Sequence, residues 1–449
     1  MRGFLFKSDD RNPMPETTIH DVIVLGGGPA GLMAGISAAE TGARVLVLEG
    51  ESRPGKKLLI TGGGHCNITN REVSEKDFRS GEPRAVRNIL RAFPVRAATG
   101  FFREIGMDLV TDKDGKMFPR TRRAGTVLEA LLARAKDLGV VLETGMTVLC
   151  VETGGGSFAV SGRDFMRRAR AVVVATGGLS YPETGSRGAG YAIAKALGHR
   201  IVPTMPALVP LETKDRDWRS LAGITFEVRL ALKVAGTVRF ASAGPLLITH
   251  QGFSGPAIMD LSASWAHLPE KQDAVVVADL IPGTGDKELR DAFARYMTEH
   301  PASSLRKFLA RYFPERLSVL LLERAGLDPA RQMAHCSRRE REILIRSVRA
   351  ISLPIDRSCG YDKAEVTAGG VAMADVEPRT LESRKVPGLF FAGEVLDVDG
   401  RIGGFNLHWA WASGQVAGME AAKASKRPGM PGPALSIVES QVPRTRSRN

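Results

Sequence analysis

Three glycines and one acidic residue near the start of the chain have the types and spacing of a dinucleotide-binding site. Gly26, Gly28 and Gly31 form a G-x-G-x-x-G pattern, and Glu49 follows eighteen residues after Gly31. Gly26 permits a sharp turn, Gly28 lets backbone approach a pyrophosphate, and Gly31 lets a helix pack closely against a strand. Glu49 can accept hydrogen bonds from a ribose 2′-hydroxyl and would repel a 2′-phosphate, so the pattern predicts a bound adenosine diphosphate of the FAD or NAD kind.

The sequence around these residues predicts the elements that would position them. A β-branched run at 21–25 precedes the glycines, an Ala-rich helix follows at 32–41, and a buried strand at 43–49 ends in the acid. Strand, turn, helix and strand make a βαβ unit, in which N–H groups at the helix start hold phosphates. Another buried strand, at 171–175, leads into Thr176-Gly-Gly, which predicts a second glycine turn at the same crevice. A chance glycine-rich turn would lack this context.

The rest of the chain predicts a discontinuous first domain with an insertion. Helical patterns cover 86–93, 97–105 and 128–138, and short strands at 140–143, 147–152 and 158–161 look like a meander. From residue 201 the sequence changes to prolines, strand-like alternation and then helical spacing. After Pro354 the glycine-rich, small-residue pattern of the first part of the chain returns. We therefore expect a loose tail at 1–19, a first domain at 20–200 and 355–422, an inserted substrate or cap domain at 201–354, and a basic tail at 423–449.

Composition bounds the class of protein and its partners. The chain has 449 residues, 43% of them hydrophobic and 25% charged, which excludes a disordered or collagen-like protein. Sixty-two Lys and Arg against 49 Asp and Glu give a net charge of +13. Such a surplus favours a polyanionic partner, although solubility alone is the plainer explanation.

The four cysteines and the absence of long apolar runs indicate in which compartment of the cell the protein is expected. No C-x-x-C pair or His-rich cluster occurs, so we expect neither a structural metal nor a disulfide framework, and a reducing cytoplasm fits. The first nineteen residues contain charged residues and no apolar core, unlike a secretory signal. No run of about 18 apolar residues occurs, so no membrane span is expected.

Four longer stretches carry a resemblance to a known family. They are GKKLLITGGGHCNITN at 55–70, ATGGLSYPETG at 175–185, ITHQGFSGP at 248–256 and GEVLDVDGRIGGFN at 393–406. With the glycine fingerprint they resemble the BaiN/RdsA-like FAD-dependent oxidoreductases, which are flavoproteins of the type with two dinucleotide-binding domains. The resemblance covers about residues 20 to 422. It implies an α/β fold, with a Rossmann-like FAD-binding domain interrupted by an insertion that has a β-barrel-like part and a helical part.

The resemblance also implies which residues hold FAD. Gly26, Gly28, Gly31 and Glu49 would bind the ADP half, and the backbone of Val148 would lie near the adenine. Gly393, Asp397 and Asn406 would lie near the ribityl and isoalloxazine end. Further cofactor contacts are expected at Pro29, Ala30, Gly50, Lys57, Leu58, Gly63, Asn67, Thr176, Gly177, Glu394, Gly404 and Leu407. The family usually has Arg before the Cys-Asn pair, whereas this chain has His65, which would hold an anion only when protonated.

A flavin performs the hydride step itself, so the protein must orient the substrate, exclude water and supply a proton. Cys66 and His65, in the glycine-rich loop, are candidate proton donors, although a free Cys is often only a small buried residue. His250 could line the substrate site or be structural. Tyr181 is a weaker candidate because Tyr-Pro often shapes a turn, and His408 could simply begin a helix. The chain has no second G-x-G-x-x-G after a strand, so NAD(P)H is expected as a transient electron donor without a domain of its own.

Two activities follow from the resemblance, and charge helps to choose between them. Relatives reduce a uridine in large-subunit ribosomal RNA to dihydrouridine, or carry out a reductive step in bile-acid dehydroxylation. Eleven basic residues against five acidic ones at 79–123, and six basic residues at 331–349, suit a phosphate backbone better than a steroid. The leading hypothesis is therefore an rRNA dihydrouridine synthase, with hydride delivered to uracil C6 and a proton from Cys66 or His65 to C5. An NAD(P)H oxidoreductase of a small unsaturated metabolite, and a non-catalytic RNA-binding assembly factor, are the alternatives.

Overall fold

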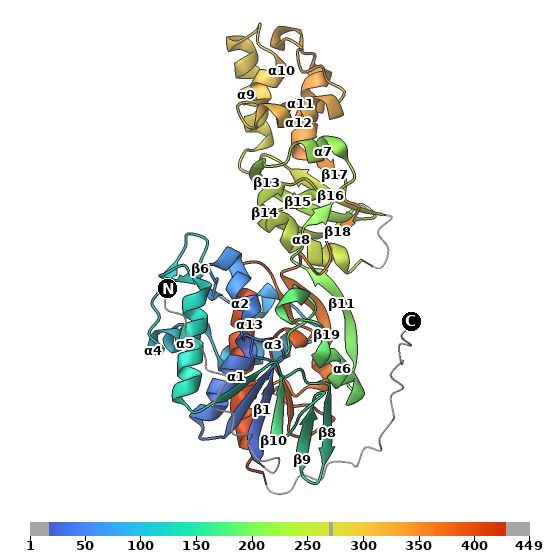
Figure 1. The fold of residues 1–449 in the computed structure, drawn as a ribbon. Coiled ribbons are helices and arrows are strands. Elements are labelled where there is room, and N and C mark those ends of the chain that lie inside the picture. The colour runs from blue at the N-terminus through green and yellow to red at the C-terminus, as the bar shows by residue number, and fades with distance from the viewer. Residues whose placement is uncertain (1–17, 269–272, 428–449) are drawn as a thin grey trace, which may run out of the picture.

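The computed structural model describes residues 18–268 and 273–427 and shows two units joined by a pair of long strands (Figure 1). One hydrophobic core draws on residues from Val22 to Leu197 and from Val371 to Ala424, and we call this part the Rossmann-like unit. A second core spans residues from Leu211 to Leu353, and we call this part the inserted unit. Chain segments far apart in sequence therefore build the first unit, and one continuous segment builds the second.

A seven-stranded sheet forms the centre of the Rossmann-like unit. Its main path runs β7-β2-β1-β10-β9-β8, and β20 also pairs with β10. The bounds are β1 Ile19–Leu25, β2 Val45–Glu49, β7 Val141–Thr144, β8 Cys150–Gly154, β9 Ser157–Ser161, β10 Met166–Val174 and β20 Leu389–Phe391. Strands β7, β2, β1, β10 and β20 are parallel, whereas β9 and β8 are antiparallel. The expected α/β class with a Rossmann-like sheet is confirmed.

The expected meander is wrong for its first strand. Strand β7 lies at the opposite edge of the sheet from β8 and pairs in parallel with β2. The helix before it, α5 (Ala124–Asp137), packs beside α1, so β7 closes a helical crossover and does not continue into a hairpin. Only β8, β9 and β10 form the antiparallel part, and β8 begins at Cys150, three residues later than expected.

The helix that begins at the glycine turn packs very closely against a second helix. α1 (Pro29–Glu40) packs against α13 (Phe405–Ala424), the long red helix in Figure 1. A Cβ added to Gly414 would lie 2.5 Å from the Ala30 carbonyl oxygen, and one added to Gly418 would lie 2.2 Å from that of Ala34. Backbone contact therefore sets the separation of these helices. Because α13 runs to Ala424, the start of the expected basic tail belongs to this helix, and residues 1–17 and 428–449 lie outside the described residues.

Shorter elements complete the Rossmann-like unit. The helices are α2 Lys56–Ile60, α3 Pro83–Ala92, α4 Val95–Glu104 and α6 Ala189–Ala196. The strands are β3 Thr69–Asn70, β4 Phe78–Arg79, β5 Leu109–Thr111, β6 Lys116–Pro119 and β21 Asp399–Gly400. Both α3 and α4 pack on α13 through a small apolar face, because residues such as Val86, Ile89 and Phe102 recur at helical spacing.

The inserted unit combines an antiparallel sheet with a helical end. Its sheet runs β17-β16-β13-β14-β15-β12-β18, with β17 and β18 at the edges. The strands are β12 Leu211–Glu212, β13 Thr225–Val234, β14 Thr237–Ile248, β15 Gly252–Ser254, β16 Ala274–Asp279, β17 Ile351–Leu353 and β18 Arg357–Ser358. The helices are α7 Arg216–Ser220, α8 Pro256–Ala266, α9 Asp286–Glu299, α10 Leu305–Leu309, α11 Glu315–Arg324 and α12 Arg338–Arg349. Figure 1 shows α9 to α12 at the end farthest from the Rossmann-like sheet.

The junction between the units is ordered by strands, a small core and one arginine. β11 (Ile201–Ala207) pairs antiparallel with β19 (Val366–Val371), and a separate cluster of apolar residues surrounds them. Arg79 pairs with Asp399 at 3.1 Å and donates to the Asp260 carbonyl oxygen on α8 at 3.0 Å. The Asp260 carboxylate accepts the Ile402 N–H at 2.6 Å. Both units therefore contribute polar groups to one boundary. None of the helices in the described ranges is long and apolar enough to cross a bilayer.

Candidate functional site

The glycine turn places its residues at the carboxyl end of β1, as the sequence predicts for a dinucleotide site. Gly26 has φ +103°, and a Cβ added to Gly31 would lie only 1.8 Å from the Gly26 carbonyl oxygen. Gly28 precedes α1 without a side-chain cap, and nothing lies within 4 Å of a Cβ built there. Pro29 begins the helix and Ala30 is buried in its first turn. The turn therefore leaves backbone N–H groups and open space at the helix start, which suits a pyrophosphate.

Glu49 closes this end of the site. Its Oε2 accepts the Gly27 N–H at 2.7 Å and its Oε1 accepts the Glu51 N–H at 2.8 Å. Burial raises the pKa of Glu49, while the two backbone donors favour its charged form. Each carboxylate oxygen has a second lone pair, so a ribose hydroxyl can still donate to it. Gly50 lies against Thr147, which places Val148 one residue from this contact.

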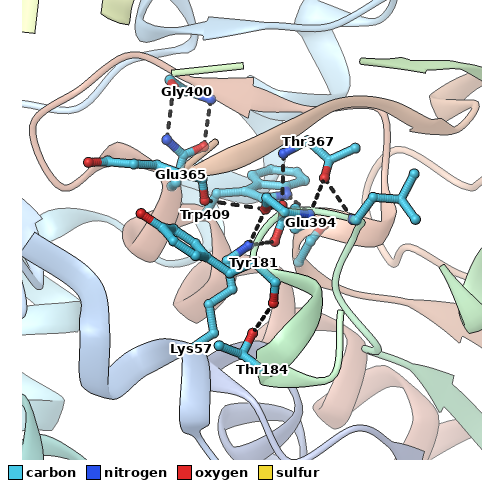
Figure 2. Close-up of polar contacts among 12 residues, drawn as sticks. Lys57, Tyr181, Thr184, Glu365, Thr367, Glu394, Gly400 and Trp409 are labelled. Carbon is cyan, nitrogen blue, oxygen red and sulfur yellow. Dashed lines mark hydrogen bonds and ion pairs between the residues drawn. The ribbon is translucent and has the colours of Figure 1, made fainter. Parts of the chain in front are cut away.

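A polar network centred on Glu394 connects three distant segments (Figure 2). Lys57 on α2 donates to Glu394 Oε2 and to Ser180 Oγ, both at 2.6 Å. Glu394 Oε1 accepts from Ser180 Oγ and from the Thr367 N–H, both at 2.8 Å. Thr367 Oγ1 in turn accepts the backbone N–H groups of Leu179 and Ser180. This network ties the Ala175–Gly178 turn, β19 and the start of α2 into one rigid wall.

The other expected cofactor residues near the start of α13 are held by backbone contacts. Asn406 and Gly400 exchange two hydrogen bonds, each of 2.8 Å, between the amide side chain and the backbone. Gly393 has φ +75°, and its carbonyl oxygen accepts from Trp409 Nε1 at 3.1 Å. Gly404 has φ +93° and lies against Asn67, since a Cβ there would be 2.7 Å from Asn67 Oδ1. Asp397 lies beside Gly81, since a Cβ added to Gly81 would be 3.8 Å from Asp397 Oδ2.

Two buried oxygens test whether these residues fit a dinucleotide. Asn67 Oδ1 and Thr176 Oγ1 are buried and have no hydrogen-bond partner among the described residues. An unpaired buried oxygen is costly, so both atoms fit positions for polar groups of a bound cofactor. Gly63 and Gly177 have positive φ angles of 65° and 70° and lie in the two loops that carry these atoms. We conclude that the residues present fit a bound FAD.

Two expected cofactor contacts have apolar surroundings. Leu58 has no exposed surface and belongs to the main core, and Leu407 packs partly against the same core. The side chains of Leu58 and Leu407 stabilise α2 and α13. At these two positions the cofactor would be contacted by backbone atoms, or by the side chain of a neighbouring residue instead.

The candidate proton donors lie in very different surroundings. Cys66 has φ +57° and no exposed surface, and burial raises the pKa of its thiol to about 12. His65 is exposed, and its Nδ1 lies 2.9 Å from the Arg122 carbonyl oxygen. His250 is exposed in the β14–β15 turn of the inserted unit, where its carbonyl oxygen accepts from Arg219. His408 is fully buried on α13, with Nδ1 2.9 Å from Thr69 Oγ1. These roles stay predictions, and the structure does not bring the four groups together.

Tyr181 has the most unusual backbone of the candidates. Its φ of +52° is rare for a tyrosine, and the conformation is held by Thr184 Oγ1 donating to its carbonyl oxygen at 2.7 Å. Its N–H donates to the Tyr361 carbonyl oxygen at 3.0 Å. Figure 2 shows the Tyr181 ring and the Glu365 side chain directed to the same side, away from Glu394. Burial first, and then the Glu365 carboxylate, raise the pKa of the Tyr181 phenol.

Sequence reasoning missed Ser180, Thr367, Glu365 and Asp260. Ser180 follows the Gly177-Gly178 turn and Thr367 precedes Gly369 and Gly370 on β19, and these positions were a usable signal. Glu365 and Asp260 had no local signal because the fold brings them to the junction from segments about a hundred residues apart. Although Glu365 is accessible to solvent, the protein around it raises its pKa, and Lys57 partly offsets that effect.

The comparison with family models decides the family. The model described as the HI0933-like protein Rossmann domain matches residues 20–420. The chain belongs to this family. The family is that of the BaiN/RdsA-like FAD-dependent oxidoreductases, so the resemblance seen in the sequence is confirmed.

Curated relatives of this HI0933-like chain match it along almost their whole length. It is 34% identical over 403 residues to a 3-dehydro-bile acid Δ(4,6)-reductase of Clostridium scindens, covering 89% of this chain and 98% of that protein. It is 32% identical over 410 residues to a ribosomal RNA dihydrouridine synthase of Escherichia coli, covering 90% and 99%. A synthase of the same name from Haemophilus influenzae is 30% identical, covering 89% and 98%. The chain is therefore an FAD-dependent oxidoreductase and an enzyme, which sets aside the non-catalytic assembly factor.

Proposed function

We propose that this HI0933-like enzyme reduces a uridine of large-subunit ribosomal RNA to dihydrouridine. Two relatives that match nearly the full chain carry that activity in their names, but the bile-acid reductase is slightly more similar, so identity does not choose between them. The observation that carries the proposal is the net charge of +13, because a polymer of phosphates is attracted by many separate cations and a steroid is not.

The acids at the junction fit a nucleobase better than a phosphate. Glu365 and Asp260 lie at the boundary between the units, and Asp397 lies nearby at the start of the segment that leads into β21. Carboxylates repel phosphates but accept hydrogen bonds from a ring N–H, such as N3–H of uracil. A uridine would enter with its base at this boundary and its phosphates outside it. A base held between the two units at this boundary has to leave any helical stack first.

The chain's own residues orient and protonate the substrate. When bound and reduced, FAD would supply a hydride to C6 of uracil while C5 takes a proton, and NAD(P)H is the proposed transient electron donor. The Glu394 network holds Lys57, Ser180 and Thr367 in fixed positions, so the wall of the site does not reorganise during the reaction. Tyr181 is the proposed proton donor: a phenol is protonated near neutral pH, and the Tyr181 ring faces the same side as Glu365. Cys66 is also protonated, but its side chain has no exposed surface from which to reach a substrate.

A small unsaturated metabolite is the second candidate, favoured by the 34% identity to the bile-acid reductase. The two candidates differ in a direct test. The purified holoprotein is reduced without oxygen and mixed with an unmodified transcript of large-subunit rRNA, or with a 3-oxo-Δ4,6 steroid, while flavin absorbance is followed. Flavin oxidation by the RNA, with dihydrouridine found in its nucleosides, supports the proposal. Oxidation by the steroid and none by the RNA would replace it. We also propose that the enzyme works in the cytoplasm, where its RNA substrate is made.

A further inference from the structure

Two consecutive helices of the Rossmann-like unit carry an unusual row of positive charge. The segment from Pro83 to Arg103, which forms α3 and most of α4, contains five arginines and no Asp or Glu. They are Arg84, Arg87, Arg91, Arg96 and Arg103, and all five are exposed. We call them the arginine row.

Helical spacing puts these side chains on one side of each helix. Arg84, Arg87 and Arg91 are related as i, i+3 and i+7, and Arg96 and Arg103 as i and i+7. The opposite sides of α3 and α4 are buried, with Ile89 and Phe102 fully covered. Seven residues of helix advance about 10 Å, so the charges follow one another along each helix and do not form a single point.

Most of the row is not neutralised within the protein. Arg87 pairs with Glu75 at 2.7 Å, whereas the guanidinium groups of Arg84, Arg91, Arg96 and Arg103 have no ion-pair or hydrogen-bond partner in the ranges 18–268 and 273–427. Many other arginines of the chain are paired, such as Arg290 with Glu342 and Arg324 with Asp215. Unpaired arginines at regular spacing are available to an external anion.

The row begins beside the candidate site. Gly81, two residues before α3, lies beside Asp397, and the preceding strand β4 pairs with β21 at Asp399 and Gly400. The row then leads away along α3 and α4. A chain of phosphates lying on it would have one end next to the junction, where Asp397, Asp260 and Glu365 lie.

We propose that the arginine row binds the sugar–phosphate backbone of the RNA substrate and places one nucleotide at the junction. This inference rests on the proposed function and adds to it the surface that recognises the substrate. A small anion, such as a carboxylated steroid, would need one or two of these cations. A row along two helices fits a polymer, because each phosphate contact releases a counterion and adds to the affinity.

The test compares two triple variants of the holoprotein with equal changes in charge. The first is Arg84→Gln, Arg91→Gln and Arg96→Gln on the row. The control is Arg216→Gln on α7 with Lys287→Gln and Arg295→Gln on α9 of the inserted unit, where three exposed cations also have no ion-pair partner among the described residues. Gln has nearly the helix propensity of Arg, so both should fold, and flavin content and melting temperature check this.

Binding to an unmodified transcript of large-subunit rRNA is measured between about 50 and about 300 mM salt, and dihydrouridine formation is measured alongside. Loss of three phosphate contacts should lower the slope of log affinity against log salt by ~2 and weaken binding at low salt by ~10- to 100-fold. The control should keep the wild-type slope.

Each other outcome has a separate meaning. An unchanged slope in the row variant, an equal change in both variants, or no RNA binding by the wild type would overturn the inference. Wild-type protein that binds RNA through the row but forms no dihydrouridine would overturn the proposed function and leave the row as an RNA-binding surface. A row variant that binds RNA normally but binds anionic lipid vesicles less well would assign the row to a membrane surface instead.

Discussion

Two regions of the molecule, the α1–α13 contact beside the glycine turn of the Rossmann-like unit and the aromatic core of the inserted unit, are built on different kinds of contact. In the first, backbone atoms meet at glycines: α13 touches α1 at Gly414 and Gly418, and the turn at Gly31 touches Gly26. In the second, large side chains fill the space between elements. Phe293 and Phe308 have ring centroids 4.9 Å apart, and Trp218 and Phe253 lie 5.4 Å apart.

The difference indicates where a substitution should affect cofactor binding and where it should affect stability. Backbone contacts have no rotamers to adjust, so one added methyl group must move a whole helix. Side-chain cores lose stability when a ring is removed, but the remaining elements keep their places. We therefore expect cofactor binding to depend on single atoms in the Rossmann-like unit and the inserted unit to affect overall stability first.

The largest effect should come from Gly31→Ala. Its Cβ would lie 1.8 Å from the Gly26 carbonyl oxygen, so α1 or the turn must shift, and we expect a loss above about 4 kcal/mol and no flavin in the purified protein. The matched control is Gly28→Ala, whose Cβ meets nothing within 4 Å and whose φ is −80°. It should fold normally and lose only flavin affinity. Gly31→Ala with full flavin content and a normal melting temperature would contradict the account.

Phe308→Ala should be the next largest. The ring is fully buried among Phe293, Tyr296 and Tyr312, and its removal should lower the free energy of unfolding by about 3–5 kcal/mol. Flavin absorbance in the folded protein should not change. Val238→Ala, half exposed in the same unit, should cost little. Denaturant titrations followed by flavin and tryptophan fluorescence measure both quantities. Flavin loss at unchanged stability would break the distinction between the units.

His408 should make the Rossmann-like unit sensitive to acid. Burial lowers its pKa to about 4, below the usual 6.5, so the unfolded chain binds more protons between those values. Stability from this group is complete above pH 6.5 and is lost as pH falls toward 4. At pH 5 the loss is about 2 kcal/mol. His408→Gln should flatten this part of the stability curve, measured by denaturant midpoints from pH 4.5 to 8. An unchanged slope would show that other groups carry the acid sensitivity.

Glu394→Gln should give the smallest effect. Glu394 is mostly buried and accepts from Lys57, Ser180 and the Thr367 N–H, so loss of its charge should cost about 1–2 kcal/mol and weaken flavin retention. Glu342→Gln is the control, because Glu342 pairs with Arg290 at an exposed site and such pairs contribute little. Thermal unfolding and flavin release measure the two effects. Equal losses of stability and of flavin retention in the two variants would show that the Glu394 network is not part of the cofactor site.

Local sequence patterns predicted the part of the fold in which backbone dictates the residue type. Only glycine fits Gly26 and Gly31, so the turn, α1 and Glu49 at the end of β2 were readable without a structure. The edge of the sheet could not be predicted, because a short strand such as Val141–Thr144 is compatible with either a hairpin or a parallel partner, and α5 decides between them.

The candidate site was predictable only where its residues lie in glycine-rich stretches. Lys57, Asn67, Thr176 and Glu394 lie in such stretches, and the structure brings Lys57 and Glu394 into direct contact. Glu365 and Asp260 are positioned by long-range packing of α8, β11 and β19, which no local pattern encodes. The spacing of the arginine row was present in the sequence, but its exposure and lack of partners needed the structure.

The most direct test of the central claim is nucleoside mass spectrometry of large-subunit rRNA from the source organism, with the gene deleted and then restored. The account predicts that deletion removes a dihydrouridine and that the wild-type gene restores it, whereas the Gly31→Ala variant does not. An unchanged dihydrouridine content after deletion, in cells with no other enzyme able to form it, would contradict the claim.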